Sequence, residues 1–194
     1  MKLALFGYGG HAREVAVQIN NTVDFFVDDE YSNQYVRPIS TFNPEVYMMM
    51  VAVADPKYRE EIVKRLPKET RYFKFIHPTA QIFAKDVEIG EGSFIGANTI
   101  ITSNVKIGKH AILNRGNQIG HDCRIGDYFS AMPGAIVSGN VTIGDSVYLG
   151  TNSTVIEKKQ ISSNIIIGAN GVVVKNIINP GTYVGVPAKL LKNE

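Results

Sequence analysis

Residues 89–126 read IGEGSFIGANTIITSNVKIGKHAILNRGNQIGHDCRIG, and the Ile-Gly pair that opens this stretch returns every eighteen residues. From Ile89 to Val173 every sixth residue is aliphatic, and Ala131 is the only small one among them. One bulky aliphatic residue per six suits a chain that turns after each short strand and winds around a triangular prism. Three repeats close one coil, so residues eighteen apart stack and the aliphatic side chains fill the axis. The sequence therefore predicts a parallel β-helix of about five coils without an inserted loop.

The first 76 residues follow a different pattern, in which short apolar runs alternate with amphipathic ones. This alternation predicts a small parallel sheet with helices, a Rossmann-like α/β domain. We expect strands at residues 2–6, 24–29, 46–54 and 71–76, and helices at residues 12–20 and from Pro56 onward, where Asp55 supplies the cap. His77-Pro78 ends this pattern, so the sequence predicts an α/β domain at residues 1–76 and a β-helix domain at residues 77–194.

A glycine turn, Gly7-Tyr8-Gly9-Gly10-His11, follows the first expected strand, at the sheet edge where ligands bind. With Ala12 it fits the dinucleotide fingerprint, which brings a phosphate to a helix N-terminus. An NAD domain normally needs two such halves, so a single nucleotide or its diphosphate fits better, and a tight structural turn is the alternative. Asp28 and Asp29 end the second strand and could bind a ribose or base, or form a solvated acidic turn.

Composition excludes several classes of function. The 194 residues carry a net charge of +2, with no basic run among aromatics and no apolar run that could span a bilayer. We therefore expect neither nucleic acid nor a membrane as a partner. The single cysteine, Cys123, excludes an internal disulfide, and residues 1–6 lack the features of a signal peptide. These features predict a cytoplasmic protein, in which Cys123 fits a small packing residue better than a nucleophile.

The histidines argue against a metal enzyme. A zinc site on a β-helix needs three clustered imidazoles, whereas no two of His11, His77, His110 and His121 lie within five residues of each other. The eighteen-residue stacking places no second histidine above or below His110. We therefore expect no metal, and we expect His77, at the domain junction, to be structural.

His121 is the candidate catalytic base. It follows Ile119-Gly120 at a turn, outside the six-residue series of inward-pointing aliphatic residues, and Asp122 comes directly after it. Eighteen residues later Gly139 should lie above the imidazole, so a backbone N–H could hold a developing oxyanion beside a base. Asp122 could fix the imidazole tautomer if the chain bends here, because neighbours on a strand point to opposite faces. A merely solvated turn histidine is the alternative.

The repeats resemble the left-handed parallel β-helix of the hexapeptide-repeat acyltransferases, and the handedness rests on this resemblance. Over nearly its whole length the chain also resembles the nucleotide-sugar N-acetyltransferases of the PglD/NeuD type. The motifs that carry this second resemblance are Gly7-Tyr8-Gly9-Gly10-His11, Asp28-Asp29, Ile76-His77-Pro78, Leu113-Asn114, and the runs 121–126 (HDCRIG), 138–141 (SGNV) and 184–189 (VGVPAK).

The resemblance implies a role for each matching residue. His121 would be the general base, Asp122 its orienting carboxylate, Gly139 the donor of the oxyanion N–H, and Asn114 a sugar contact. The nucleotide would be bound by residues of the glycine turn and of the acidic pair: Gly9, Gly10, His11, Asp28 and Asp29. Gly10 and His11 would contact the diphosphate. Coenzyme A would lie in a groove between subunits, lined by Gly168, Ala169, Pro187, Ala188 and Lys189.

One position departs from the family pattern. Many relatives carry a second histidine, which contacts the acetyl donor, where this chain has Ser130. We expect Ser130 to hydrogen-bond the donor in its place and to alter the affinity for it. Lys189 and Lys192 could pair with the phosphates of coenzyme A, although Lys192 could equally belong to a solvated basic tail.

The function implied is transfer of an acetyl group from acetyl-CoA to the 4-amino group of a nucleotide-linked 4-amino-dideoxy sugar, by a homotrimer and without a metal. Two alternatives remain open at this point. The first is a sugar O-acetyltransferase of the sialic acid type, and the second is a non-catalytic scaffold that binds a nucleotide.

Overall fold

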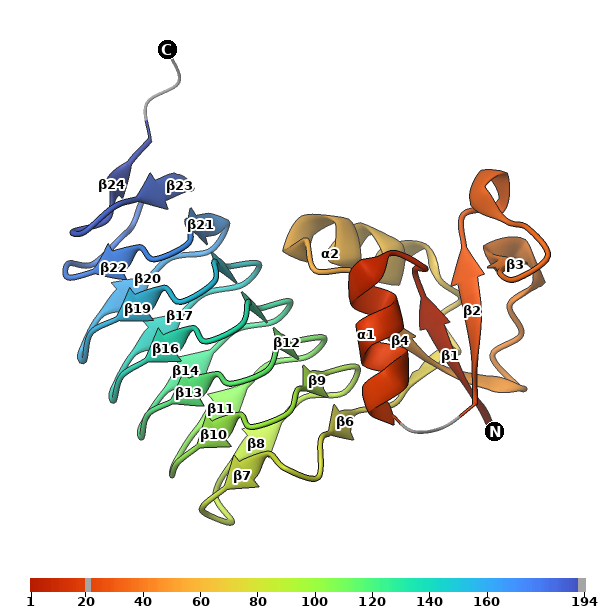
Figure 1. The fold of residues 1–194 in the computed structure, drawn as a ribbon, viewed down its shortest axis with the longest axis horizontal. Coiled ribbons are helices and arrows are strands. Elements are labelled where there is room, and N and C mark those ends of the chain that lie inside the picture. The colour runs from red at the N-terminus through yellow and green to blue at the C-terminus, as the bar shows by residue number, and fades with distance from the viewer. Residues whose placement is uncertain (20–21, 192–194) are drawn as a thin grey trace.

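The computed structural model describes residues 1–19 and 22–191, which form an α/β domain beside a tall triangular prism (Figure 1). The α/β domain is built on a five-stranded parallel sheet with the order β3-β2-β1-β4-β5. Its strands are β1 (Lys2–Phe6), β2 (Val23–Val27), β3 (Arg37–Pro38), β4 (Tyr47–Val51) and β5 (Arg71–Tyr72). Its helices are α1 (Gly10–Ile19), α2 (Pro56–Arg65) and two single 3-10 turns at Asp29–Tyr31 and Ile39–Thr41.

The two faces of this sheet have different partners. Alternate residues of a strand point to opposite faces, so Leu5 packs with α1 and the prism, whereas Phe6 packs in the cluster that contains Ile62 of α2. The predicted cap of α2 is confirmed, since Asp55 Oδ1 accepts the N–H of Tyr58 at 2.8 Å. Helix α1 begins two residues earlier than expected, and Asn20, the expected last residue of this helix, lies outside the described residues.

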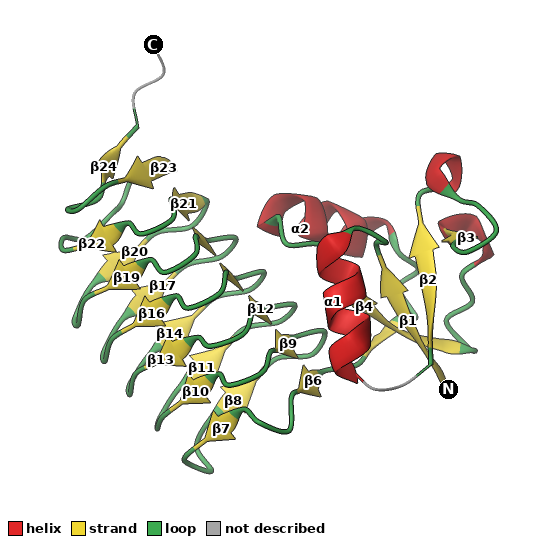
Figure 2. Ribbon diagram, in the orientation of Figure 1, coloured by secondary structure: helices red, strands yellow, loops and turns green. Residues whose placement is uncertain are grey.

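The prism has three walls of parallel strands, which Figure 2 shows as yellow arrows joined by green turns. The first wall holds β6 (Phe75–Ile76), β9 (Phe94–Ile95), β12 (Ile112–Leu113), β15 (Ser130–Ala131), β18 (Tyr148–Leu149) and β21 (Ile165–Ile167), extended by β23 (Gly181–Val184) and β24 (Lys189–Leu190). The second wall holds β7 (Gln81–Ile82), β10 (Ile100–Ile101), β13 (Gln118–Ile119), β16 (Ile136–Val137), β19 (Thr154–Val155) and β22 (Val172–Val173). The third wall holds β8 (Glu88–Ile89), β11 (Lys106–Ile107), β14 (Arg124–Ile125), β17 (Thr142–Ile143) and β20 (Gln160–Ile161).

The prediction that every sixth residue points into the prism is confirmed. All residues of this series from Ile95 to Val173 are buried, and Ile89, in the lowest coil, is partly buried against the same core. The corners repeat with the same period, because one residue of each turn adopts a left-handed conformation. Asn fills six of these positions, from Asn98 (φ 57°) to Asn170 (φ 55°), and Asn accepts this conformation more readily than most residues do. The regular corners explain why the coils stack without an inserted loop.

The expected strand at residues 71–76 is wrong, because it is two strands in two different sheets. Arg71–Tyr72 pairs with β4 of the α/β domain, whereas Phe75–Ile76 pairs with β9 of the first coil. The chain leaves one sheet and enters the other within two residues. This pairing favours a domain boundary between Tyr72 and Phe75, slightly before the expected division after residue 76.

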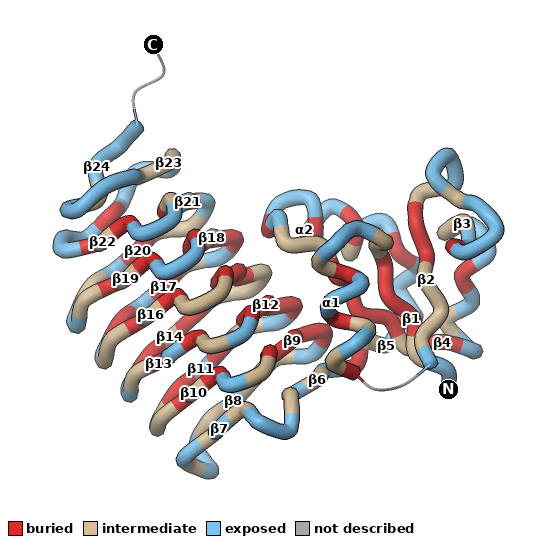
Figure 3. Tube along the Cα trace, in the orientation of Figure 1, coloured by how far each residue is buried: buried red, intermediate tan, exposed pale blue. Residues whose placement is uncertain are grey.

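The three walls differ in what their outward side chains meet. On the first wall Phe94 and Ile112 are buried under the α/β domain. The third wall carries exposed polar residues such as Lys106 and Gln160. The outward residues of the second wall include three aliphatic ones, Ile100, Ile136 and Val172, each half-buried. In Figure 3 exposed chain also runs along β24 at the top of the prism, whereas most of β23 is of intermediate burial.

No helix among residues 1–19 and 22–191 is long and apolar enough to cross a membrane.

Candidate active site

The predicted pair of His121 and Asp122 occupies the second corner of the prism, between the second and third walls. Asp122 adopts a left-handed conformation (φ 60°), so the chain bends there and both side chains project outward. His121 Nδ1 lies 2.7 Å from Asp122 Oδ2. The carboxylate can accept only from a protonated Nδ1, and in the neutral imidazole this tautomer has Nε2 as the nitrogen able to act as a base. The bend on which this pair depends is therefore present.

Gly139 lies directly above the imidazole, in the next coil. A Cβ built on Gly139 would be 2.5 Å from His121 Nε2, so only glycine leaves room for the ring. The main chain fixes this stacking, because the N–H of Asn140 donates to the carbonyl of His121 at 2.7 Å. Within the part of the chain that the structure describes, the N–H of Gly139 donates to no acceptor. The corner thus combines a base with a free backbone donor one coil away.

Two further residues, which the sequence analysis missed, hold the carboxylate in place. Asn104 Nδ2 donates to Asp122 Oδ1 at 2.6 Å, and Arg124 binds the side chain of Asn104 at 2.8 Å. The hydrogen bond from His121, and after it the one from Asn104, keeps the pKa of Asp122 below its ordinary value. Asn104 precedes Asp122 by eighteen residues, so the stacking rule could have revealed it.

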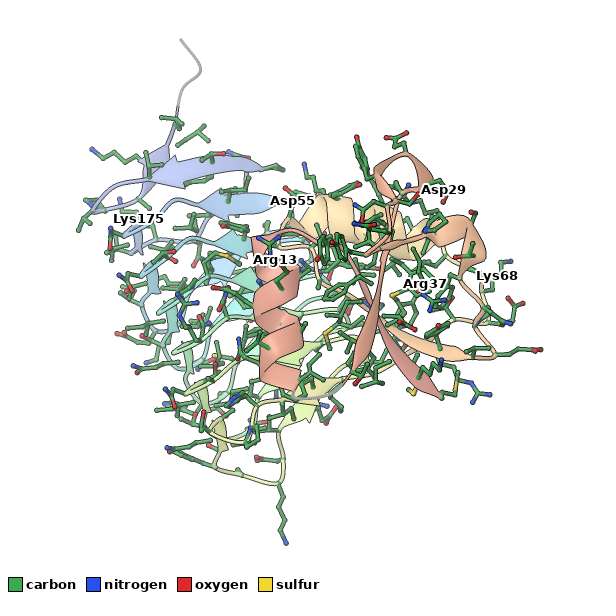
Figure 4. All side chains as sticks on the ribbon, turned by 45° about the vertical axis from the view of Figure 1, so that its right-hand side comes forward. Arg13, Asp29, Arg37, Asp55, Lys68 and Lys175 are labelled. Carbon is green, nitrogen blue, oxygen red and sulfur yellow. The ribbon has the colours of Figure 1, made fainter. Side chains whose placement is uncertain are left out.

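A second candidate region is a cleft of about 850 Å³ between α1 and the first corner of the prism, where the first and second walls meet. It brings together Gly10 and His11 from the glycine turn with Asn114, which lies just past β12. Burial lowers the pKa of His11 and so favours the neutral ring. Arg13, labelled on α1 in Figure 4, also lines the cleft. Three of the six residues predicted to bind the sugar nucleotide thus line one cleft.

The two acidic residues share one hollow of about 560 Å³, but only Asp28 also reaches the glycine turn. Asp28 lines a hollow of about 330 Å³ with Tyr8 and Gly9, and its carboxylate is bound by Tyr58 and Arg65. Asp29 instead accepts the N–H of Ser40 at 3.0 Å, and this hydrogen bond lowers its pKa. The structure therefore places Asp28, and not Asp29, beside the glycine turn.

The residues expected to line a coenzyme A groove gather at the top of the prism. Gly168 donates its N–H to Tyr183 of β23, and Ala188 donates to Val172 of β22. Ala169, Pro187 and Lys189 are exposed around these contacts. Lys192 lies outside the described residues.

Ser130 requires a correction, because the structure does not leave it free for an acetyl donor. It lies on the first wall under the α/β domain and is fully buried. Its hydroxyl donates to the carbonyl of Ala54 at 2.7 Å and accepts from Arg59 at 2.9 Å. Because the hydroxyl already donates one hydrogen bond and accepts another, Ser130 belongs to the contact between the domains.

Within one chain the two candidate regions lie on different corners. The cleft is at the first corner and His121 is at the second, on the side away from α1. Lys175, in the last coil of that second corner, is labelled at the opposite side of the prism from Arg13 in Figure 4. His121 is accordingly not among the residues that line the cleft of its own chain.

No group of three metal-binding side chains occurs among the residues that the structure describes. Cys123 is buried inside the prism, and this burial raises the pKa of its thiol. The expected packing role of Cys123 is confirmed.

Comparison with known proteins places this geometry in a family. Two family models match, the PglD N-terminal domain over residues 2–66 and the bacterial transferase hexapeptide (six repeats) over residues 86–121. The structure of WeeI from Acinetobacter baumannii AYE is 30% identical, covers 98% of this chain and 100% of that chain, and superposes with a TM-score of 0.89. The comparison with curated protein sequences gives no match.

Two further solved structures are similar over the whole length. PerB from Caulobacter crescentus, in complex with CoA and GDP-perosamine, is 28% identical with a TM-score of 0.87, covering 99% of this chain and 98% of that chain. The acetyltransferase domain of PglB from Neisseria gonorrhoeae FA1090 is 25% identical with a TM-score of 0.71, covering 98% of this chain and 99% of that chain. The prism is accordingly a left-handed β-helix, as predicted, and the chain belongs to the PglD/NeuD-type family of nucleotide-sugar N-acetyltransferases.

Proposed function

We propose that this protein transfers the acetyl group of acetyl-CoA to the 4-amino group of a nucleotide-linked 4-amino-dideoxy sugar. The observation that carries the proposal is the stacking of Gly139 on the ring of His121, with Asp122 on the other ring nitrogen. Family membership supports the substrate class, and the PerB relative was solved with CoA and GDP-perosamine. The single cysteine fits the reducing cytoplasm, where we place the enzyme.

The reaction follows from the roles of three groups. The neutral amine of the sugar attacks the thioester carbonyl and forms the C–N bond, while His121 Nε2 accepts the proton of the amine. The N–H of Gly139 stabilises the negative charge that develops on the carbonyl oxygen. Collapse of the tetrahedral intermediate breaks the C–S bond and expels the thiolate, which takes up a proton. Asp122 holds the imidazole in the required tautomer and stabilises its charged form.

We further propose that the active site is completed in a homotrimer. The α/β domain covers the first wall and the third wall is polar, so the second wall, with Ile100, Ile136 and Val172, is the apolar face left for self-association. If this wall faces a three-fold axis, the second corner of each subunit meets the first corner of the next one, as in a head-to-tail ring. That arrangement brings His121 to the cleft of a neighbouring subunit. The expected coenzyme A residues lie higher on the same first corner.

The direct test is to mix the purified protein with acetyl-CoA and GDP-perosamine, or the matching uridine-linked amino sugar, and to measure free thiol and the acetylated product. We expect thiol release only with a nucleotide-linked amine. Release with sialic acid and not with the amines would favour O-acetylation. Saturable acetyl-CoA binding without any turnover would remove the catalytic proposal.

Gly10→Asp tests the assignment of the cleft. The first turn of α1 has open space at Gly10, and an acidic side chain there is compatible with the helix N-terminus. It should therefore fold normally but repel a diphosphate, and we expect the KM for the sugar nucleotide to rise about tenfold or more. Gly10→Ser is the matched control, because it adds a side chain of similar position without charge. Equal KM values for the two variants would contradict diphosphate binding at this turn.

Mixing two impaired variants, at a sugar-nucleotide concentration well below the KM of Gly10→Asp, tests the shared site. His121→Ala lacks the base and Gly10→Asp has a weakened nucleotide site, so random trimers of the two should regain intact sites at about one quarter of positions. Recovery of activity after mixing is expected if each site combines two subunits. Absence of recovery, with mixed trimers demonstrated by differential tags, would show that both groups act from the same chain.

A further inference from the structure

Arg59 is a charged side chain that is buried completely. It extends from α2 into the seam between the α/β domain and the first wall of the prism. Burial lowers the pKa of its guanidinium to about 9, which still leaves the group charged at pH 7. Among the described residues no carboxylate forms a hydrogen bond or ion pair with it.

The guanidinium instead joins main-chain carbonyls of both domains. On the α/β side, Nη1 donates to the carbonyls of Val53 and Ala54. On the prism side, Nε donates to the carbonyl of His110 at 2.8 Å, and Nη2 donates to Tyr128 at 2.7 Å and Phe129 at 3.1 Å. Since the five N–H donors of a guanidinium lie in one rigid plane, these bonds fix the distance and the angle between the two domains.

Stability alone does not account for an arginine at this place. Taking a charge out of water is expensive, and a buried ionic group can often be replaced by a well-packed apolar one without loss of stability. Such a group can instead select one arrangement among several, because misplaced hydrogen-bond partners leave a buried charge unsatisfied. The two bulky residues beside it, His110 (φ 55°) and Tyr128 (φ 57°), also hold left-handed conformations that are unusual for large side chains.

Two of the carbonyls that Arg59 binds, those of Val53 and Ala54, belong to residues that line the proposed substrate site. Ala54 lines the large cleft together with Gly10 and Asn114. Val53 lines the hollow beside the glycine turn. Ser130 completes the arrangement, because its hydroxyl accepts from Arg59 and donates to the carbonyl of Ala54. A shift of this seam would change the distance between the nucleotide-binding turn and the prism.

We propose that Arg59 and Ser130 are positioning residues for the nucleotide sugar, and that they set the width of the cleft into which the sugar extends. This inference rests on the proposed function of the cleft. It also gives a role to the serine that stands where many relatives carry a histidine. In this chain the position holds the two domains in register, and it does not contact the acetyl donor.

The variants Arg59→Met, Arg59→Lys and Ser130→Ala test the proposal, with Lys64→Met, an exposed cation of the same helix, as the matched control. For Arg59→Met we expect the KM for the sugar nucleotide to rise about tenfold or more, with the KM for acetyl-CoA changed less than about twofold. Arg59→Lys should recover part of this loss. Ser130→Ala removes one hydroxyl, so it should fold and raise the same KM about threefold. Lys64→Met should behave like the parent protein.

Small-angle scattering gives a readout that is independent of activity. We expect Arg59→Met to broaden the distribution of interatomic distances while its circular dichroism stays that of a folded protein. If Arg59→Met does not fold, Ser130→Ala decides by its KM values alone. An unchanged KM for the sugar nucleotide in Ser130→Ala and in any folded Arg59 variant would overturn the inference. Absence of acetyl transfer in the parent protein would instead overturn the proposed function.

Discussion

Gly139→Ala is the change that most directly tests the chemistry of the second corner. The added methyl group would lie 2.5 Å from Nε2 and 2.7 Å from Cε1 of His121. Carbon atoms in contact normally stay about 3.5 Å apart, so the ring has to retreat by about 1 Å. The imidazole is 63% exposed and can swing outward, so the free energy of unfolding should change by less than about 1 kcal/mol.

Catalysis should suffer far more than folding does. Displacing the ring separates the base from the oxyanion donor, and a misplacement of about 1 Å can reduce a rate about a hundredfold. We therefore expect kcat to fall about 10² to 10³-fold, within the range for loss of a general base or an oxyanion contact. Thiol release from acetyl-CoA at saturating substrate measures kcat, and urea unfolding measures stability.

The double variant distinguishes displacement of the ring from damage to the coil. In a His121→Ala background the new methyl group meets no imidazole, so adding Gly139→Ala should reduce kcat little further. Gly126→Ala is the control, because its Cβ would meet Asp145 and the main chain at another corner, where no catalytic group lies. It should lower stability and leave kcat unchanged. A Gly139→Ala enzyme with the parent kcat, or fully multiplicative losses in the double variant, would refute the reasoning.

Three other changes have expected outcomes. Asp122→Asn should lower kcat about tenfold to a hundredfold, because the imidazole loses its anionic partner. Steady-state kinetics would show this loss, and a parent-like kcat would speak against the orienting role. Asp55→Ala removes the cap on the N–H of Tyr58 and should lower the unfolding free energy by about 1 kcal/mol in a urea titration, with kcat retained. Burial lowers the pKa of His110 to about 4, so the folded state resists protonation and its stability falls as the pH drops from about 6.5, the unfolded pKa, towards 4. Between pH 7 and 4.5 the protonation of this group should reduce the unfolding free energy by about 2.5 kcal/mol. In His110→Phe, which keeps the aromatic contacts, the fall in unfolding free energy over the same interval should be smaller than in the parent by this amount. Identical acid profiles for the two proteins would exclude His110 as the cause.

The inward-pointing residues of the prism could be predicted one by one, because the same pattern of one aliphatic residue in six recurs in every coil. The positions of Ile95 and Val173 differ by a multiple of six, so both had to point inward, and the stacking of Gly139 on His121 followed from the same count. The α/β domain gives no such redundancy. Residues 71–76 read RYFKFI, a short run rich in aromatic residues, and nothing local shows that Phe75 changes sheets.

The seam between the domains was beyond a sequence-based prediction for a similar reason. The repeat shows that Ser130 points outward from its wall, but it does not show which part of the chain covers that wall. Arg59 lies among charged residues on α2, where a charged side chain is usually solvated. Only the packing of α2 against the prism shows that Arg59 is buried and that Ser130 is its partner.

The uniform coil of eighteen residues has a consequence for how this protein can change in length. Duplication or loss of eighteen residues would lengthen or shorten the prism by one coil and keep the side chains aligned along its axis. Any other insertion would have to bulge out at a corner, because a shift of even one residue would turn the aliphatic column towards solvent. The height of such a prism can therefore grow only in fixed steps.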